Sequence, residues 1–163
     1  MHCKILILCT AMSLSLAAGP AIAHSDAPKA GAKVTTKAEQ MPFGVAGDPK
    51  KVTRTINMDA LDTMRYSPST INVKVGETIR FVMHNKGKIM HEIVIGTPAE
   101  LKEHAALMKK FPTMEHDAPH MLHVAPGKKG EMVWEFNRAG SFTFACLIAG
   151  HFEGGMAGTI VVS

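Results

Sequence analysis

From Val52 onward the chain consists mainly of short runs in which apolar and polar residues alternate. A period of two places alternate side chains on opposite faces, as in a strand with one buried face. Turn residues such as Gly and Pro separate these runs. We predict strands at residues 52–58, 71–75, 78–83, 91–95, 131–136, 141–146 and 159–162. About seven short strands with regular turns predict an all-β fold, a Greek-key β-sandwich.

One segment follows a helical pattern instead. Thr97 is a suitable N-cap, Pro98 fits the first turn, and Glu100 completes a capping box. The predicted helix runs to Lys110, and Pro112 ends it. Residues 114–123, which follow the helix, are rich in Met and His and are predicted to form an irregular loop insertion.

The first 23 residues have the features of a secretory signal. Lys4 precedes a mostly apolar stretch from Ile5 to Ala18, which at 14 residues is too short to span a bilayer. Ala21-Ile22-Ala23 is a small-x-small cleavage site. Cleavage after Ala23 would leave 140 of the 163 residues. We therefore expect a periplasmic protein with no stable membrane anchor after cleavage.

The predicted mature chain divides into two parts. Residues 24–51 are rich in Ala, Gly, Lys, Pro and Thr and are predicted to form a flexible N-terminal arm. Residues 52–163 contain all the predicted strands and form the expected folded domain. The formal net charge of +4 becomes +3 once Lys4 is removed, and the basic residues are scattered. This distribution does not indicate a nucleic-acid partner.

The cysteine content limits the chemistry that the predicted mature chain can carry. Cys3 and Cys9 lie in the predicted signal, so the mature chain keeps Cys146 alone and cannot form an internal disulfide. A lone thiol in an oxidising compartment is exposed to oxidation unless something occupies it. A bound metal ion would do so.

Cys146, His151 and Met156 form a motif with a spacing of five residues, and Gly and Ala fill much of the space between them. The small residues allow the loop to fold back and direct all three donors at one point. Two imidazoles, one thiolate and a weak axial thioether define a blue-copper electron-transfer site. The loop supplies three of these four ligands, so a second His must come from elsewhere.

The best candidate for that second His is His91, which shares one face of a predicted strand with Ile93 and Ile95. His84, seven residues earlier, also lies at a strand end and is the alternative. We expect His84 to be an exposed strand-terminal residue.

An upstream His on a strand followed by Cys-x4-His-x4-Met resembles the cupredoxin family, and the loop spacing is most similar to that of azurin and rusticyanin. Over residues 43–163, roughly three quarters of the chain, the sequence resembles the periplasmic cupredoxins associated with copper tolerance. The stretches that carry this resemblance are Asp62-Thr63-Met64-Arg65-Tyr66, residues 75–81, Met90-His91-Glu92, residues 111–116 and the loop 146–156.

The resemblance implies one type 1 copper held by His91, Cys146, His151 and the axial Met156. Asn85 precedes His91 and is expected to hydrogen-bond the backbone of the ligand loop. Glu92 stands where many cupredoxins have Asn or Ser, and it is expected to lie beside the ligands.

Beyond these ligands the predicted mature chain holds nine further Met and six further His. Thioether and imidazole donors together suit Cu(I), so a second copper site is a reasonable hypothesis, with core packing of Met as the alternative. The candidate residues lie in one stretch: His104, Met108, Met114, His116, His120, Met121 and His123.

The function expected from the residues and the resemblance is copper binding with Cu(I)/Cu(II) redox in copper tolerance. The alternative is a dedicated electron carrier between respiratory or redox partners. Either role implies a redox or copper-exchange protein partner in the periplasm. An enzyme is not expected: a thiol hydrolase would leave Met156 unexplained, and a multicopper oxidase needs His-x-His pairs, which the chain lacks. A metal-free adhesion sandwich would not predict the ligand motif.

Overall fold

The computed structural model describes residues 38–114 and 117–163. The predicted signal, most of the predicted arm and His116 lie outside the described residues. In the described part, one 3-10 helix, η1 (Pro49–Lys51), and one α-helix, α1 (Pro98–Lys110), accompany ten strands. The strands are β1 (Val45–Ala46), β2 (Arg54–Leu61), β3 (Arg65–Ser67), β4 (Thr70–Val73), β5 (Glu77–Asn85), β6 (His91–Gly96), β7 (Met121–Val124), β8 (Lys129–Phe136), β9 (Gly140–Ala145) and β10 (Ala157–Val162).

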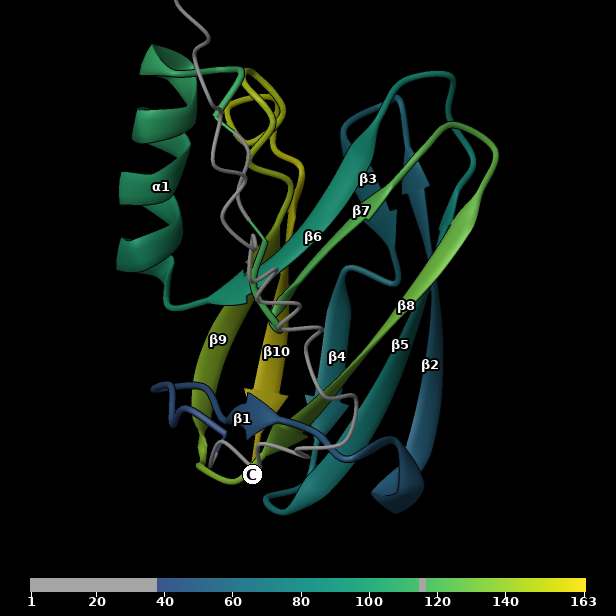
Figure 1. The fold of residues 1–163 in the computed structure, drawn as a ribbon, viewed down its shortest axis with the longest axis vertical. Helices are drawn as coiled ribbons and strands as arrows, with labels where there is room; N and C mark the ends of the chain where they lie inside the picture. Colours follow the sequence, from purple (N-terminus) through teal and green to yellow (C-terminus); the bar gives the residue numbers. More distant parts are fainter. Residues whose placement is uncertain (1–37, 115–116) are drawn as a thin grey trace, which may run out of the picture. The chain divides into compact units, whose positions relative to one another are not determined.

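These strands form two five-stranded sheets that pack face to face (Figure 1). The first sheet has the order β1-β8-β5-β2-β3, and the second has the order β4-β10-β9-β6-β7. Parallel pairing joins β2 to β5 and β4 to β10, and the remaining neighbours are antiparallel. The predicted two-sheet β-sandwich with one helix is confirmed.

The core lies between the sheets and follows the alternation seen in the sequence. Alternate residues of β5 and β8 are buried, while their neighbours are half-buried or exposed, apart from Thr78 at the start of β5. The main core cluster includes these inward-facing side chains: Ile79, Phe81, Met83, Met132, Trp134, Phe136, Ile93, Ile95 and Phe144. Alternation therefore located the inner face of each long strand correctly.

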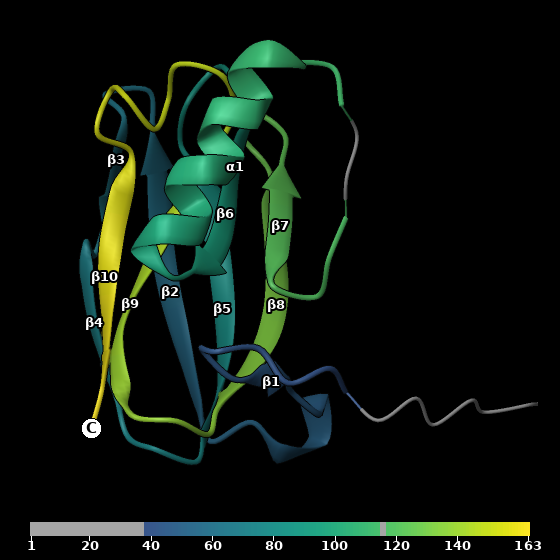
Figure 2. The ribbon, with the colours of Figure 1, turned by 90° about the vertical axis from the view of Figure 1, so that its left-hand side faces the viewer.

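Strand β6 is buried along its whole length, and α1 covers part of its outer face (Figure 2). Ile93 and Ile95 point into the sandwich, whereas Val94 packs outside with Leu101 and Met108 of the helix. The predicted capping box starts α1: the Thr97 hydroxyl accepts the Glu100 N–H, and the Glu100 carboxylate accepts the Thr97 N–H. The helix holds its place through this second, smaller apolar cluster.

The folded part of the chain begins before residue 52, within the predicted arm. Residues 38–51 contain β1 and η1, and β1 pairs with β8 in the first sheet. Phe43 is 1% exposed, stacks on Trp134, and accepts the indole N–H of Trp134 at 2.9 Å through its carbonyl oxygen. The expected boundary is corrected to include this segment, because one buried aromatic ring is enough to fix it against the core.

Two other short strands were not predicted. Strand β3 is three residues long, and β7 occupies part of the stretch assigned to the irregular insertion. Strand β7 pairs with β6, so Glu92 lies opposite His123. The insertion between α1 and β7 is therefore shorter than expected. Within the described residues, neither helix is long and apolar enough to cross a membrane.

Candidate metal centre

The ligand loop, residues 146–156, joins β9 to β10 at the end of the sandwich where β6 begins (Figure 1). Backbone hydrogen bonds close the loop on itself. The N–H of Cys146 donates to the Met156 carbonyl at 3.0 Å, and the N–H of Met156 donates to the His151 carbonyl at 3.0 Å. The predicted folding back of the loop is thus achieved by hydrogen bonds that join the three donor residues directly.

Two glycines make this tight path accessible to the backbone. Gly150 and Gly155 have φ values of 88° and 90°, a region that residues with a Cβ adopt at a steric cost. Further turn bonds, from His151 N–H to Ile148 and from Gly154 N–H to Gly150, wind the loop into successive turns. The small residues noted in the sequence serve this path.

His91, Cys146 and His151 come together as one cluster. One donor atom from each residue can be chosen so that all three lie within 4.8 Å of one another. The thiol Sγ of Cys146 lies 3.2 Å from Nδ1 of His151, and the two imidazole rings are 5.2 Å apart between centroids. The second histidine of the cluster is therefore His91; His84 pairs with Lys129 across β5 and β8 and is not part of it.

The orientation of the His91 ring is set by Asp62, in the turn between β2 and β3. Nε2 of His91 lies 3.0 Å from Oδ1 of Asp62, while Nδ1 is buried without a hydrogen-bond partner among the described residues. A ring nitrogen held by a carboxylate leaves the other nitrogen as the metal ligand. The partnerless Nδ1 beside a thiol and a second imidazole is the donor arrangement that suits copper.

Burial favours the uncharged forms of the Cys146 thiol and the His151 imidazole. Desolvation raises the pKa of the Cys146 thiol to about 12, and it lowers the pKa of His151, with the neighbouring His91 acting in the same direction. Hydrogen bonds, first that from the Lys88 N–H, lower the pKa of Asp62. At neutral pH the thiol is therefore protonated, and metal binding must release its proton.

Glu92 joins the His91 strand to the ligand loop. Its carboxyl group is 1% exposed; Oε1 accepts the Leu147 N–H at 2.6 Å, and Oε2 lies 2.7 Å from Nε2 of His123. The Glu92 carbonyl also accepts the hydroxyl proton of Tyr66. Glu92 therefore accepts a hydrogen bond from the backbone of the ligand loop.

Asn85 does not have the contact expected of it. Its side-chain amide donates to the carbonyls of Ile89 and Val124, both at 2.8 Å, and its side-chain oxygen accepts the Gly87 N–H at 2.9 Å. These bonds shape the loop that leads to His91. Asn85 is the last residue of β5 and lies beside β7. Its side chain therefore bonds the segments named above and not residues 146–156.

Met156 is fully buried and belongs to the main core cluster, as does Cys146. Its backbone is fixed to Cys146 and His151 by the two hydrogen bonds described above. Arg65 supports the adjacent turn by donating to the Gly154 carbonyl at 2.8 Å. On the other side, Lys109 of α1 forms an ion pair with Glu153 of the loop at 3.4 Å.

The structure separates the residues considered for a second copper site. Met108, Met114 and His123 line one groove, whereas His104 and His120 line another pocket with Met41. His120 packs edge-on against Phe43 and Trp134. Met121 is 7% exposed on β7 and packs in the smaller apolar cluster. His116 lies outside the described residues.

Sequence reasoning missed Asp62 and Tyr66 as contributors to the site. Both lie in a stretch that carried the family resemblance, but they contact His91 and Glu92 across 29 and 26 residues of chain. Neither has a local pattern that indicates such a contact. The resemblance itself was the only signal available in that stretch.

Comparison with known proteins identifies the family. A family model described as copper binding proteins, plastocyanin/azurin family, matches residues 51–163. The chain therefore belongs to the plastocyanin/azurin family of copper-binding proteins. The resemblance to cupredoxins is confirmed.

Individual relatives agree with this assignment. The chain is 54% identical to the copper-resistant cuproprotein CopI of Rubrivivax gelatinosus over 121 residues, which cover 74% of this chain and 73% of that protein. It is 34% identical to the protein of the same name from Pseudomonas aeruginosa, with 74% and 82% covered. The structure of reduced auracyanin from Roseiflexus castenholzii aligns with a TM-score of 0.56 and 23% identity, covering 69% of this chain and 98% of that one, which shows the shared fold.

Proposed function

We propose that this chain is an exported mononuclear copper protein of copper tolerance, in which Nδ1 of His91, Sγ of Cys146, Nδ1 of His151 and the thioether of Met156 would hold the metal. The proposal rests on the clustering of His91, Cys146 and His151, each of which has a donor atom within 4.8 Å of the others, and on Nδ1 of His91, which is buried without a partner among the described residues. Cys146 is fully buried, and so is Met156, whose backbone is hydrogen-bonded to those of Cys146 and His151.

Copper bound at these residues would supply a one-electron couple between Cu(I) and Cu(II). The chain's own residues would hold one geometry for both states. Asp62 fixes the His91 ring, and the closed backbone of the ligand loop holds Cys146, His151 and Met156. A site held by such outer contacts moves little when its charge changes, which favours rapid electron exchange with a protein partner.

The role in copper tolerance is supported by the relatives, which are named copper-resistant cuproproteins and cover about three quarters of this chain. We infer a periplasmic location from the signal expected in residues 1–23, and a copper-handling or redox protein as the partner. Because the thiol and both imidazoles would be ligands, no side chain of the cluster is left to act as nucleophile or base. A binding and redox role is therefore favoured over an enzymatic one.

The proposal is tested by the optical spectrum of the copper-loaded protein. We expect strong visible thiolate-to-copper absorption in the parent protein and in His84→Ala, and its loss in Cys146→Ser and His91→Ala. Far-ultraviolet circular dichroism should show that all four proteins keep the sandwich. Absorption that survives in Cys146→Ser, or that is lost equally in His84→Ala, would contradict the ligand set.

The biological role needs a separate test in the source bacterium. A strain that lacks this protein should grow poorly under copper stress and recover when the parent gene, but not the Cys146→Ser gene, is returned. Normal growth of the deletion strain under copper stress would reject the tolerance role and leave that of an electron carrier.

A further inference from the structure

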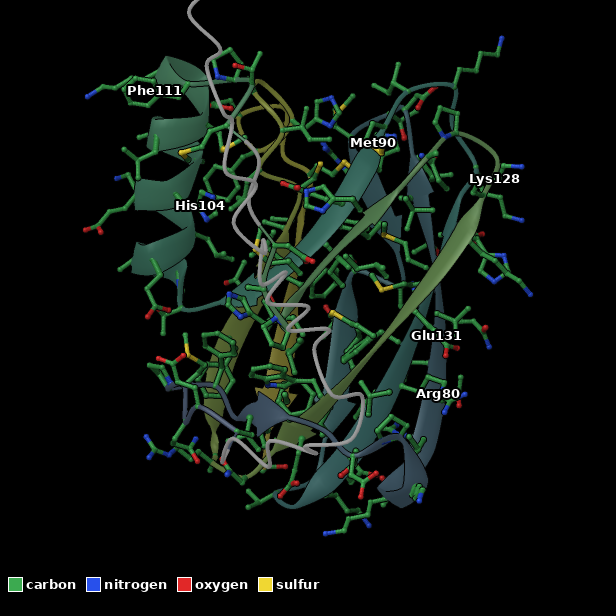
Figure 3. The ribbon with its side chains drawn as sticks, in the orientation of Figure 1. Arg80, Met90, His104, Phe111, Lys128 and Glu131 are labelled. Atoms are coloured by element: carbon green, nitrogen blue, oxygen red, sulfur yellow. The ribbon has the colours of Figure 1, made fainter. Side chains whose placement is uncertain are left out.

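A hollow of about 500 Å³ opens where β5 ends and β8 begins. Its lining comes from the end of β5 with the residue after it, and from the turn between β7 and β8 with the first residue of β8: His84, Asn85, Lys86, Gly127, Lys128 and Lys129. Figure 3 shows Lys128 in this turn, at the same end of the sandwich as Met90, where the chain enters β6. The hollow therefore lies at the end of the sandwich that carries the candidate metal centre.

Three of the lining residues are lysines, and a fourth lysine follows in the loop between β5 and β6. We define these four exposed residues as the lysine patch: Lys86, Lys88, Lys128 and Lys129. None of them forms an ion pair with a carboxylate in the part of the chain that the structure describes. By contrast, Arg80 and Glu131, which lie farther along the same two strands, form an ion pair at 3.7 Å (Figure 3). The positive charge of the lysine patch is thus left for a partner to neutralise.

The two loops that carry the lysine patch are held together through Asn85. Its backbone N–H donates to the Lys128 carbonyl at 2.9 Å, and its carbonyl accepts the Gly127 N–H at 3.1 Å. Its side-chain amide donates to the carbonyls of Ile89 and Val124, both at 2.8 Å. Asn85 is 1% exposed, so water competes little for these bonds. The backbone of the patch is therefore fixed before any partner binds, which lowers the cost of ordering it on binding.

The loop between β5 and β6 also connects the lysine patch to the candidate metal centre. The Lys88 N–H donates to Oδ2 of Asp62 at 2.8 Å, and Oδ1 of the same carboxylate lies 3.0 Å from Nε2 of His91. Ile89 and Met90, which stand between Lys88 and His91 in the chain, are each 43% exposed. A protein bound at the patch would therefore find exposed apolar side chains next to a proposed copper ligand. Apolar contacts beside a polar, charged rim are the usual composition of a protein interface.

We propose that the lysine patch is the docking surface for an acidic segment of the protein with which this chain exchanges electrons or copper. The proposal rests on the proposed function, because it assigns a place on the surface to the partner that this function requires. A projecting segment rich in Glu or Asp would enter the hollow and face the lysines, and the partner would contact Ile89 and Met90 beside His91. Complementary charge mainly speeds encounter and fixes orientation, which suits a partner that must leave after each exchange.

The shape and lining of the hollow favour a protein over the other polyanions that a lysine patch can attract. Attraction to anionic lipids acts across a flat surface and needs no hollow. Binding of single-stranded nucleic acid uses aromatic side chains on which bases stack, and no Phe, Tyr or Trp of the described residues lines the hollow. A projecting acidic loop uses both the charge and the concave shape.

The test uses a synthetic peptide of six glutamates as the probe. It is titrated into the reduced, copper-loaded protein at low ionic strength while the backbone amide resonances are followed. We expect the largest shifts at residues 84–90 and 125–129. Lys86→Glu/Lys128→Glu should weaken peptide binding by on the order of tenfold, because it places like charges opposite the peptide. Salt at about 1 M, where the Debye length is about 3 Å, should weaken binding to the parent protein as well.

The matched control is Lys50→Glu/Lys51→Glu, which changes the net charge by the same amount. Both lysines are exposed on η1. This helix precedes β2, and the first residue of β2 pairs with Ile79 near the start of β5, at the other end of that strand from the patch. The control should bind the peptide as tightly as the parent protein. Equal losses in the two double variants, or shifts centred away from the lysine patch, would overturn the proposal.

Vesicles of phosphatidylglycerol test lipid as the other source of negative charge. The parent protein and Lys86→Glu/Lys128→Glu should sediment with the vesicles to the same small extent. Vesicle binding that is lost in this variant, together with no binding of the peptide to the parent, would overturn the proposal in favour of a membrane surface.

The visible absorption of the copper(II)-loaded protein keeps this proposal separate from that of the metal centre. The thiolate-to-copper band should be unchanged in Lys86→Glu/Lys128→Glu, because His91, Cys146 and His151 are intact. If the band is absent in all proteins while peptide binding still requires the lysines, the ligand set is wrong and the docking surface stands. If the band is present and peptide binding does not depend on the lysines, the docking surface is wrong and the ligand set stands.

Discussion

Oε1 of Glu92 accepts a hydrogen bond from the backbone N–H of Leu147 at 2.6 Å, and this bond joins the residue after His91 to the residue after Cys146. Both groups are buried. The bond therefore ties β6 to the ligand loop within the hydrophobic interior, beside two of the proposed ligands. It also places a carboxylate close to the copper position.

The first prediction concerns the reduction potential of the copper-loaded protein. Glu92→Gln keeps an oxygen that can accept the Leu147 N–H but removes the carboxylate charge. Loss of a buried negative charge disfavours Cu(II) relative to Cu(I), so the potential should rise by on the order of 100 mV, which corresponds to about 2 kcal/mol for one electron. Protein-film voltammetry measures this shift.

The matched control is Glu153→Gln. Glu153 lies on the ligand loop itself, but its side chain is 42% exposed and pairs with Lys109. Solvent and salt screen an exposed charge, so its removal should move the potential by far less than the Glu92 substitution. Equal shifts in the two variants would show that burial of the charge does not determine the effect.

The second prediction concerns Asp62, which contacts Nε2 of His91 at 3.0 Å. Asp62→Ala leaves the ring without its outer partner, and copper affinity should fall by roughly 10- to 100-fold. Asp62→Asn retains an oxygen acceptor and should lose less. Competition with a copper chelator gives both values, and Asp59→Ala on the preceding strand should bind as tightly as the parent protein.

The third prediction uses Gly87, which lies against the Asp62 carboxylate. A Cβ at residue 87 would collide with that carboxylate, so Gly87→Ala must displace it from His91. Copper affinity should therefore fall in the same direction as in Asp62→Ala. Because both substitutions act through one contact, the double variant should bind no more weakly than Asp62→Ala alone. Additive losses of copper affinity in the double variant would show that Gly87→Ala does not act through the contact between Asp62 and His91.

The features predicted correctly from the sequence depend on short chain distances. The capping box around Thr97 lies within one helical turn and marks the start of α1, and the glycine-containing stretch from Cys146 to Met156 forms the closed loop that its small residues indicate. The alternation that marked β5 and β8 is equally local. Such patterns can be read without knowledge of the fold.

The contacts that sequence reasoning missed are long-range. Asp62 and His91 are 29 residues apart, and Glu92 and Leu147 are 55 apart, so the pairing of the strands decides which groups meet. Asn85 was assigned the bond to the ligand loop because it is close to His91 in sequence, but its side chain donates to the carbonyls of Ile89 and Val124 instead. Phe43 is likewise fixed by Trp134, 91 residues away.

The last prediction concerns the stability of the copper-free protein at high pH. Burial raises the pKa of the Cys146 thiol from an ordinary value of 9.0 to about 12. Between these two values the folded protein holds a proton that the unfolded chain has released. Since the folded state then binds more protons, the free energy of unfolding must decrease as the pH rises above about 9.

Cys146→Ser isolates this effect, because serine does not titrate in that range. Urea unfolding of both copper-free proteins, from about pH 8 to about pH 10, should show the parent losing about 1.4 kcal/mol relative to the variant. Tyr66, whose pKa burial also raises, is common to both proteins, so its contribution is largely removed by the comparison. Copper bound to the thiolate should abolish this loss of stability, since the folded protein then holds no thiol proton. Parallel stability curves for the two copper-free proteins would mean that Cys146 is not buried as a thiol, and that copper meets an ionised ligand instead.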